Sequence, residues 1–192
     1  MKVKELVLGD DGQWSGVYAN SLVSAPAIER NFIYMSKQKP RNVVMQTDAG
    51  ERRMVYGPVM IPDLMIYRKD DATGEEYYAT YTSETVQKCQ QNYLKKGLQS
   101  ATTIEHAFPV MGVTMVESWL IEDSAKDKSA ALGFEALPKG TWMAGYHIED
   151  DGLWEMVKSG AINGFSVEAW FDHVEKQLSE YGSYCFAANR YW

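Results

Sequence analysis

Cysteine, histidine and long apolar runs are scarce in this sequence. Its two cysteines, Cys89 and Cys185, are far apart, so they form neither a disulfide framework nor a zinc site and are typical of a reducing compartment. Its three histidines are also widely separated and have no cysteine partner, which again argues against zinc. We therefore expect no metal ion and no other cofactor.

Membrane and nucleic-acid partners are not expected either. No apolar run approaches the roughly 18 residues of a membrane-spanning helix. Residues 1–8 carry charges within their apolar run, unlike a secretory signal. The 19 lysines and arginines are outnumbered by 26 aspartates and glutamates, a formal net charge of −7, so binding by neutralisation of nucleic-acid phosphates is disfavoured.

Length and composition predict one packed domain covering residues 1–192. A chain of 192 residues can bury its own core without disulfide bonds. Hydrophobic residues make up 45% of the sequence and aromatic residues 12%, the opposite of a disordered composition.

Alternation of apolar and polar residues with a period of two predicts many strands. We expect them at residues 2–8, 14–23, 53–61, 113–121, 141–148 and 165–171. Residues 64–67 and 76–82 flank a turn-rich spacer and should form a hairpin. Gly57-Pro58 should bend the third of these strands.

Helices are few. The clearest begins at Ser83, the expected N-cap, and ends before Gly97, and its apolar stripe includes Cys89. A shorter helix capped by Asp150 or Asp151 precedes Gly160. Many strands, few helices and no β-α-β alternation predict an α+β fold, with a mainly antiparallel sheet or barrel and the helices packed outside it.

Residues 161–171 carry the first candidate for chemistry. Asn163-Gly164 is a strong turn dipeptide, and the alternation that follows places Ser166 and Glu168 together on one strand face. A serine held just after such a turn can present its hydroxyl as a nucleophile. A single polar residue on a solvated strand face is the commoner meaning of this pattern.

A nucleophilic serine needs a base, and His106 is the first candidate. It lies 60 positions before Ser166 (166 − 106), on a different predicted element. This separation is no obstacle, because the members of a catalytic triad are neighbours in space rather than in sequence. His147 alternates with apolar residues and is expected to be an ordinary strand-face histidine.

Several long motifs occur in order along the chain, at residues 54–62, 65–68, 104–106, 116–123, 137–143 and 154–168. The last reads Trp154-Glu155-x-Val157-Lys158-Ser159-Gly160-x-x-x-Gly164-Phe165-Ser166-Val167-Glu168. Over roughly residues 16–171 the chain resembles the XkdF-like phage serine proteases, the capsid-maturation (prohead) protease group associated with PBSX-type phage elements. We place the protease-like core at about residues 14–171, because residues 172–192 form an aromatic tail that departs from the family.

The resemblance implies a fold similar to that of the herpesvirus assemblin, a partly open β-barrel with surrounding helices. It also implies a catalytic serine and histidine, and Ser166 and His106 match both positions. Ser166 is then the nucleophile that attacks a peptide carbonyl, and His106 is the base that takes its proton.

The third catalytic member stays open. Glu168 shares a strand face with Ser166, but two residues along a strand are about 6.6 Å apart. Glu168 could therefore reach a histidine next to Ser166 only from the side. Glu117, on the strand after His106, comes next in our order, followed by His173, which would give a Ser-His-His arrangement like that of assemblin. Glu105, Glu122 and Asn20 are also open, as is a dyad without a strong third member.

The function that the resemblance implies is that of a serine endopeptidase of the phage prohead. It cleaves scaffold and capsid protein, and possibly itself, during head assembly in the host cytoplasm or inside the assembling prohead. Phage capsid and scaffold proteins are the implied partners, and the sequence leaves homo-oligomerisation open. The alternative is a catalytically inactive morphogenetic protein that keeps the fold and serves as a scaffold-type module in capsid assembly. A hydrolase of small esters is disfavoured because the chain has no Gly-x-Ser-x-Gly elbow.

Overall fold

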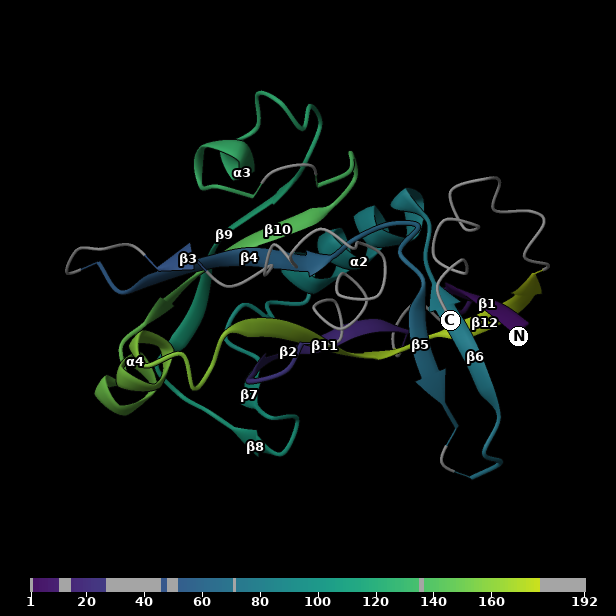
Figure 1. Ribbon diagram of the computed structural model, residues 1–192, viewed down its shortest axis with the longest axis horizontal. Coiled ribbons are helices and arrows are strands. Elements are labelled where there is room, and N and C mark those ends of the chain that lie inside the picture. Colours follow the sequence, from purple (N-terminus) through teal and green to yellow (C-terminus); the bar gives the residue numbers. More distant parts are fainter. Residues whose placement is uncertain are drawn as a thin grey trace, which may run out of the picture.

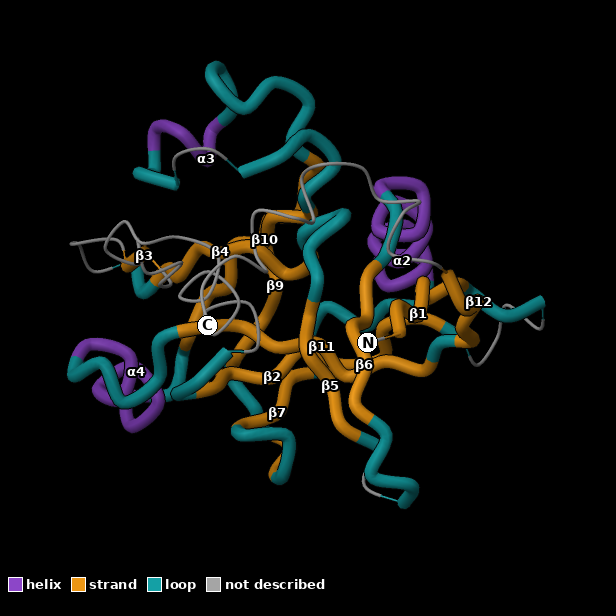
Figure 2. Tube along the Cα trace, turned by 45° about the vertical axis from the view of Figure 1, so that its right-hand side comes forward, coloured by secondary structure: helices purple, strands orange, loops and turns teal. Residues whose placement is uncertain are grey.

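Three four-stranded sheets and a few helices make up the computed structural model of the protein, which describes residues 2–10, 15–26, 46–47, 52–70, 72–134 and 137–176. The fold is mostly β-sheet and α+β in character, as the sequence predicts. Figures 1 and 2 show how the sheets lie around one another. Cys185 and most of the aromatic tail lie outside the described residues.

One sheet joins the first and last described strands to a hairpin from the middle of the chain. Its order is β12 (Asp172–Lys176), β1 (Lys2–Val7), β6 (Glu76–Thr80) and β5 (Ile66–Lys69). The predicted hairpin is confirmed, because β5 and β6 pair antiparallel. β12 covers the first residues of the predicted tail and pairs antiparallel with β1.

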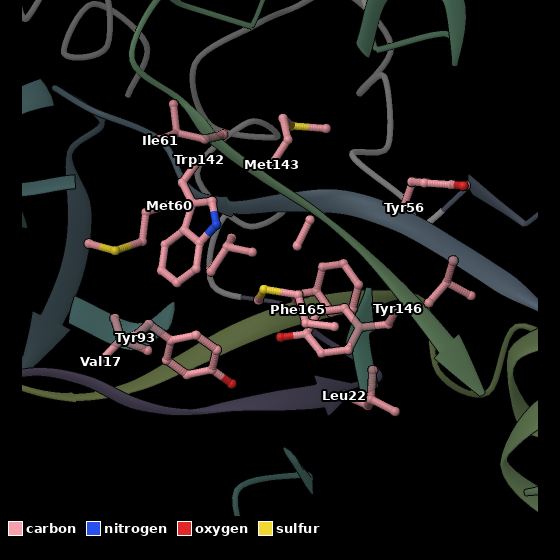
Figure 3. Close-up of a cluster of buried hydrophobic side chains, with 14 of the residues drawn as sticks. Val17, Leu22, Tyr56, Met60, Ile61, Tyr93, Trp142, Met143, Tyr146 and Phe165 are labelled. Atoms are coloured by element: carbon pink, nitrogen blue, oxygen red, sulfur yellow. The ribbon is translucent and has the colours of Figure 1, made fainter. Parts of the chain in front are cut away.

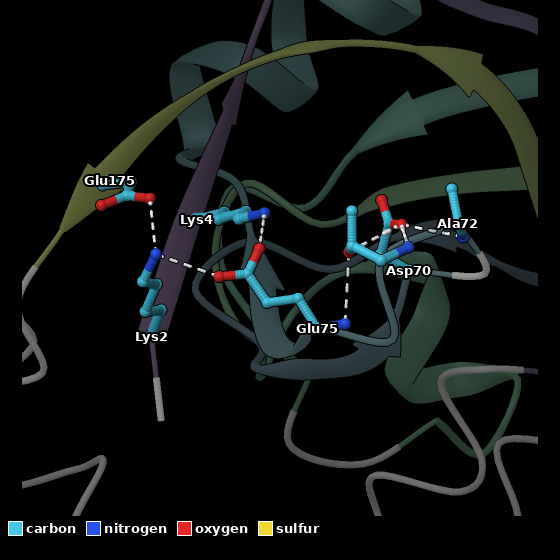
Figure 4. A network of polar contacts seen from close by, with 7 residues as sticks. Lys2, Lys4, Asp70, Ala72, Glu75 and Glu175 are labelled. Atoms are coloured by element: carbon cyan, nitrogen blue, oxygen red, sulfur yellow. Dashed lines mark hydrogen bonds and ion pairs between the residues drawn. The ribbon is translucent and has the colours of Figure 1, made fainter.

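Ion pairs connect the strands of this sheet (Figure 4). Glu75 accepts Lys4 Nζ at 2.8 Å and Lys2 Nζ at 3.0 Å. Lys2 also reaches Glu175 on β12, at 3.2 Å. Because Glu75 directly precedes β6, these contacts join β1 to strands on both of its sides. In the β5–β6 connection, Asp70 accepts the backbone N–H groups of Ala72 and Thr73, so this acidic residue stabilises a turn.

A second sheet has the order β3 (Gln46–Thr47), β4 (Met54–Met60), β10 (Trp142–Ile148) and β9 (Val113–Leu120), all antiparallel. The register of β4 against β10 shifts between Trp142 and Met143, opposite Met60 and Pro58. The irregularity predicted near Gly57-Pro58 is therefore present as a bulge next to the proline.

The third sheet has the order β11 (Gly164–Trp170), β2 (Gly16–Val23), β7 (Thr102–Ile104) and β8 (Phe108–Pro109). β11 and β2 are antiparallel, whereas β2 and β7 are parallel. β1 and β6 are a second parallel pair. The expected barrel is therefore wrong for the described strands, which form three separate sheets and no closed barrel. Strand partners far apart in the sequence decide this arrangement, and local alternation does not encode them.

The helices follow the predicted positions closely. α2 (Ser83–Lys95) is capped by Thr82, whose hydroxyl accepts the Thr85 N–H at 3.2 Å, so the predicted cap at Ser83 is wrong by one residue. α4 (Asp151–Lys158) is capped by Asp150, one of the two predicted caps. α3 (Lys128–Ala131) is a single turn in the β9–β10 connection. No helix within the described parts of the chain is long and apolar enough to cross a membrane.

The hydrophobic core lies between the second and third sheets, with α2 closing one side (Figure 3). Phe165 of β11 contacts Tyr146 of β10, with ring centroids 5.0 Å apart. Tyr93 of α2 meets Trp142 of β10 at 5.6 Å. Leu22 of β2 is also fully buried in this cluster. The core therefore takes up one face of β2 and β11 and leaves their other face for the candidate site.

Trp142 should be the main single contributor to this core. It is fully buried and its Nε1 donates to Ser118 Oγ at 2.9 Å. We expect Trp142→Ala to lower the free energy of unfolding, measured by urea denaturation, by about 3–5 kcal/mol. Trp170→Ala is the matched control, because Trp170 is 68% exposed and mainly stacks on Tyr18. It should cost at most about 1.5 kcal/mol. Equal losses in both variants would contradict this placement.

Cys89 should be chemically silent in the folded protein. Burial raises the pKa of its thiol to about 12. The reactive thiolate is therefore almost absent at mildly alkaline pH. In a Cys185→Ser variant, where Cys89 is the remaining thiol, a disulfide reagent such as DTNB should react only after guanidinium chloride unfolds the chain. Rapid reaction in native buffer would show that Cys89 is not buried.

Candidate active site

The side of the third sheet that faces away from the core holds a row of three hydroxyl groups. Ser166 on β11 is paired with Ser21 on β2, and Ser21 is paired with Thr103 on β7. Residues at paired positions of neighbouring strands point to the same face of a sheet. Phe165, next to Ser166, lies in the core, so the alternation predicted for this strand is present. Ser166 and Thr103 are partly exposed, whereas Ser21 between them is fully buried.

A bulge in β2 adds a tyrosine to this face. Glu168 is paired with Ala19 and Ala169 with Val17, so Tyr18 is the extra residue. Burial raises the pKa of Tyr18, and the negative charge of Glu168 raises it further. Tyr18 and Glu168 therefore lie close together on this face of the sheet.

His106 lies in the tight connection between β7 and β8. Ile104 pairs with Phe108, and Ala107 N–H donates to the Ile104 carbonyl at 3.0 Å. Glu105 and His106 have φ values of 49° and 57°, the left-handed region that residues other than glycine seldom adopt. The connection thus turns through two consecutive left-handed residues.

The end of β2 holds this turn by three hydrogen bonds. Glu105 N–H donates to the Leu22 carbonyl at 3.0 Å. His106 N–H donates to Ser21 Oγ at 2.9 Å. In return, Ser24 N–H donates to Glu105 Oε1 at 2.7 Å. Glu105, one candidate for the third catalytic member, is therefore engaged in holding the turn.

The imidazole of His106 faces Glu168. Its Nδ1 lies 3.3 Å from Glu168 Oε1, and the Thr103 hydroxyl donates to the same oxygen. The side chain of Glu168 is 14% exposed and that of His106 is 42% exposed. A carboxylate at Nδ1 leaves the other ring nitrogen, Nε2, available to accept a proton, which is the arrangement of a general base with its orienting acid.

Ser166 shares this face with His106 but is not hydrogen-bonded to it within the described residues. β2 lies between β11 and β7, and two strand spacings amount to about 10 Å. A proton transfer from Ser166 to His106 therefore requires Nε2 of the imidazole to approach Ser166, and the partial exposure of the ring leaves room for this movement.

Glu117 and His173, the next candidates for the third member, lie in different sheets from His106. On β9, in the second sheet, Glu117 accepts the Tyr56 hydroxyl at 2.9 Å and the Lys128 ammonium. Burial raises the pKa of Glu117, but the hydrogen bonds from Lys128 and Tyr56 outweigh it and lower the pKa overall. His173 is exposed on β12, in the first sheet.

Glu122 and Asn20 are also engaged away from His106. Glu122 forms an exposed ion pair with Lys139 at 2.9 Å. Asn20 faces the core, where its Nδ2 donates to the Tyr146 hydroxyl at 2.7 Å. Of the carboxylates considered from the sequence, Glu168 is the one whose oxygen lies within hydrogen-bonding distance of the His106 ring.

Tyr18, Ser21 and Thr103 were not predicted from the sequence as parts of this site. Each is an ordinary strand residue, and it joins the site only because β11, β2 and β7 pair in the observed register. The sequence signal available was weak: Ser21 is a polar residue within the otherwise largely apolar end of a predicted strand. Across the parts of the chain that the structure describes, no group of three or more histidine, cysteine, aspartate or glutamate side chains is arranged to hold a metal ion.

Comparison with known proteins places the chain in a phage family. The model of the family described as "Putative phage serine protease XkdF" matches residues 41–175, a span that includes Ser166, His106 and Glu168 and leaves out β2. "Phage-like element PBSX protein XkdF" of Bacillus subtilis (strain 168) is 25% identical over 166 residues, which are 83% of this chain and 54% of that protein. "Uncharacterized protein YqbD" of the same organism is 25% identical over 162 residues, 82% of this chain and 45% of that protein.

The chain spans about half the length of these two curated relatives. No solved structure matches it. Because the family model covers well over half of the residues, the chain belongs to the XkdF family of phage proteins, whose description is that of a serine protease.

Proposed function

We propose that this protein is a serine endopeptidase of phage head maturation, with Ser166 as nucleophile, His106 as base and Glu168 as the carboxylate that orients His106. The observation that carries the proposal is the 3.3 Å contact between His106 Nδ1 and Glu168 Oε1, on the sheet face that Ser166 shares. The family description supports the class of reaction.

The reaction follows the general serine-protease scheme. Ser166 Oγ attacks the carbonyl carbon of a peptide bond while its proton passes to His106 Nε2. Glu168 accepts the Nδ1–H and stabilises the imidazolium. As the tetrahedral intermediate collapses, the C–N bond breaks and His106 gives its proton to the leaving amine. In the second half of the reaction, His106 takes a proton from a water molecule, whose oxygen attacks the acyl carbon. The ester bond to Ser166 then breaks, and His106 returns the proton to Ser166 Oγ.

This mechanism requires Ser166 and His106 to come within hydrogen-bonding distance of each other. Catalytic hydrogen bonds are often long or poorly aligned without substrate and shorten when it binds. His106 lies on a hairpin turn and its ring is partly exposed, so its Nε2 can turn toward Ser166 without disturbing the sheet. The side chain of Glu168, which is on the same strand as Ser166, has to move with the ring to keep its contact with Nδ1. The carboxylate of Glu168 reaches across β2 to the Thr103 hydroxyl of β7, so it lies between β11 and the His106 turn.

The substrates of this proposal are the scaffold and capsid proteins of the same phage, and the enzyme itself. The place of action is the host cytoplasm or the interior of the assembling prohead. Both parts rest on the resemblance to prohead proteases and not on the site geometry.

A second function is favoured by one observation. The Ser166 hydroxyl makes no hydrogen bond to His106 within the described residues, as expected if the chain kept the fold and lost the reaction. In that case the protein is a morphogenetic module that binds capsid or scaffold protein without cleaving it. Cleavage of the partner proteins and covalent labelling of Ser166 separate these two functions.

Loss of the Ser166 hydroxyl should abolish cleavage. We expect the wild-type chain, co-expressed with the capsid and scaffold proteins of its phage element, to produce defined fragments that intact-mass spectrometry detects. Ser166→Ala should produce none. Ser159→Ala is the matched control, because Ser159 lies at the end of α4 and its hydroxyl donates to the Met156 carbonyl. Identical masses for the wild type and Ser166→Ala would favour the binding module.

Glu168→Gln should slow the activation of Ser166. A fluorophosphonate probe bonds covalently to an activated serine, and its rate of reaction at Ser166 can be followed by peptide mass spectrometry. Loss of an orienting carboxylate reduces catalysis by about 10²–10⁴-fold, and we expect a fall in this range. Glu117→Gln should leave the rate unchanged, because Glu117 contacts Tyr56 and Lys128. The reverse result would assign the third member to Glu117.

A further inference from the structure

Ser21 lies at the centre of the candidate site and is its most deeply buried polar residue. It is fully buried on β2, between Ser166 of β11 and Thr103 of β7. Its backbone is already fixed, because β2 pairs with a strand on each side. The sheet therefore does not need the Ser21 hydroxyl, and that hydroxyl has a different partner, the backbone N–H of His106 at 2.9 Å.

The His106 backbone is in a conformation that needs support. Residues in the left-handed region persist only where the surrounding structure holds them, and here two such residues, Glu105 and His106, are consecutive. Glu105 is held by two hydrogen bonds, one to the Leu22 carbonyl and one from the Ser24 N–H. The His106 backbone N–H is held by its hydrogen bond to Ser21 Oγ.

We propose that Ser21 is a positioning residue, which holds the His106 turn so that the imidazole faces Glu168. The inference rests on the proposed function, in which His106 is the base. The backbone dihedrals of His106 set the direction in which its side chain leaves the turn, and from there Nδ1 reaches a carboxylate on another strand at 3.3 Å. Of the three hydrogen bonds that hold the turn, the one from Ser21 is the one made to His106 itself, and it links this residue to β2, the strand between the turn and β11.

Ser21 is not a second nucleophile. Its side chain has no exposed surface, so a peptide carbonyl cannot approach it, and its oxygen already accepts a hydrogen bond. Its effect on the reaction passes through His106, whereas Ser166 is partly exposed on the same face.

Ser21→Ala removes the hydroxyl with the smallest change in volume. Thr102→Val is the matched control, because Thr102 is buried on β7 of the same sheet and its hydroxyl has no hydrogen-bond partner in the described residues. Each variant loses one buried hydroxyl, and thermal unfolding checks that each is folded. The full chain is used throughout.

Two readouts are measured on each variant. The first is the fluorophosphonate reaction at Ser166, taken over a range of probe concentrations so that the maximal rate separates from the probe affinity. The second is independent of catalysis: nuclear Overhauser contacts from the His106 ring protons to the Thr103 and Glu168 side chains, together with the amide exchange rate of His106.

We expect Ser21→Ala to lower the maximal rate by about 10²-fold with little change in probe affinity, since misplacing a catalytic group by about 1 Å costs this much. Its His106 amide should exchange faster and its ring contacts to Glu168 should weaken, while Thr102→Val resembles the wild type in both readouts. Unchanged ring contacts and amide exchange in Ser21→Ala would overturn the inference. So would an equal fall in rate in both variants.

The two proposals fail in different ways. A wild-type chain that does not react with the probe, and behaves like Ser166→Ala, would overturn the proposed function and the catalytic part of this inference with it. The ring contacts and amide exchange would then still decide whether Ser21 sets the orientation of His106.

Discussion

The register between β2 and β11 is the constraint on which the candidate site depends. Side chains along a strand alternate between its faces, so a slip of one residue would turn Ser166 and Glu168 toward the core and Phe165 toward solvent. Phe165 prevents this slip by packing against Tyr146, and Leu22 does the same from β2. The core thus holds the site although it contributes no polar atom to the exposed face of the sheet.

Glu168 is the electrostatic centre of the site. Two groups from the β7 side contact its carboxylate: the hydroxyl of Thr103 on β7 and Nδ1 of His106 in the turn after β7. Tyr18, from the β2 bulge, lies close enough for the charge of Glu168 to raise its pKa. The Glu168 side chain is mostly buried, and a buried carboxylate is stable only when such donors replace water. The bulge in β2 matters here because strict alternation along the strand would turn Tyr18 to the core face.

Part of this arrangement could be predicted from the sequence alone. Alternation around Ser166 places Ser166 and Glu168 on one face, and capping residues located α2 and α4 to within a residue, because both signals are local. The positions of Tyr18, Ser21 and Thr103 could not be predicted, since they depend on which strands pair and in which register. The parallel pairing of β2 with β7 and of β1 with β6 was missed for the same reason, and with it the absence of a barrel among the described strands. The catalytic roles of Ser166, His106 and Glu168 stay predictions.

The passage from β11 to β12 has a mechanical consequence. Only Phe171 separates the two strands, yet β11 belongs to the sheet of the candidate site and β12 to the sheet that contains β1. One nearly continuous segment therefore links the two sheets. It is held at Phe171 by the ring contact with Tyr81 and near its far end by the Lys2–Glu175 ion pair. A force on the N-terminal strand is transmitted along this segment to the strand of Ser166 directly, so the two sheets cannot shift against each other without changing the geometry of the site.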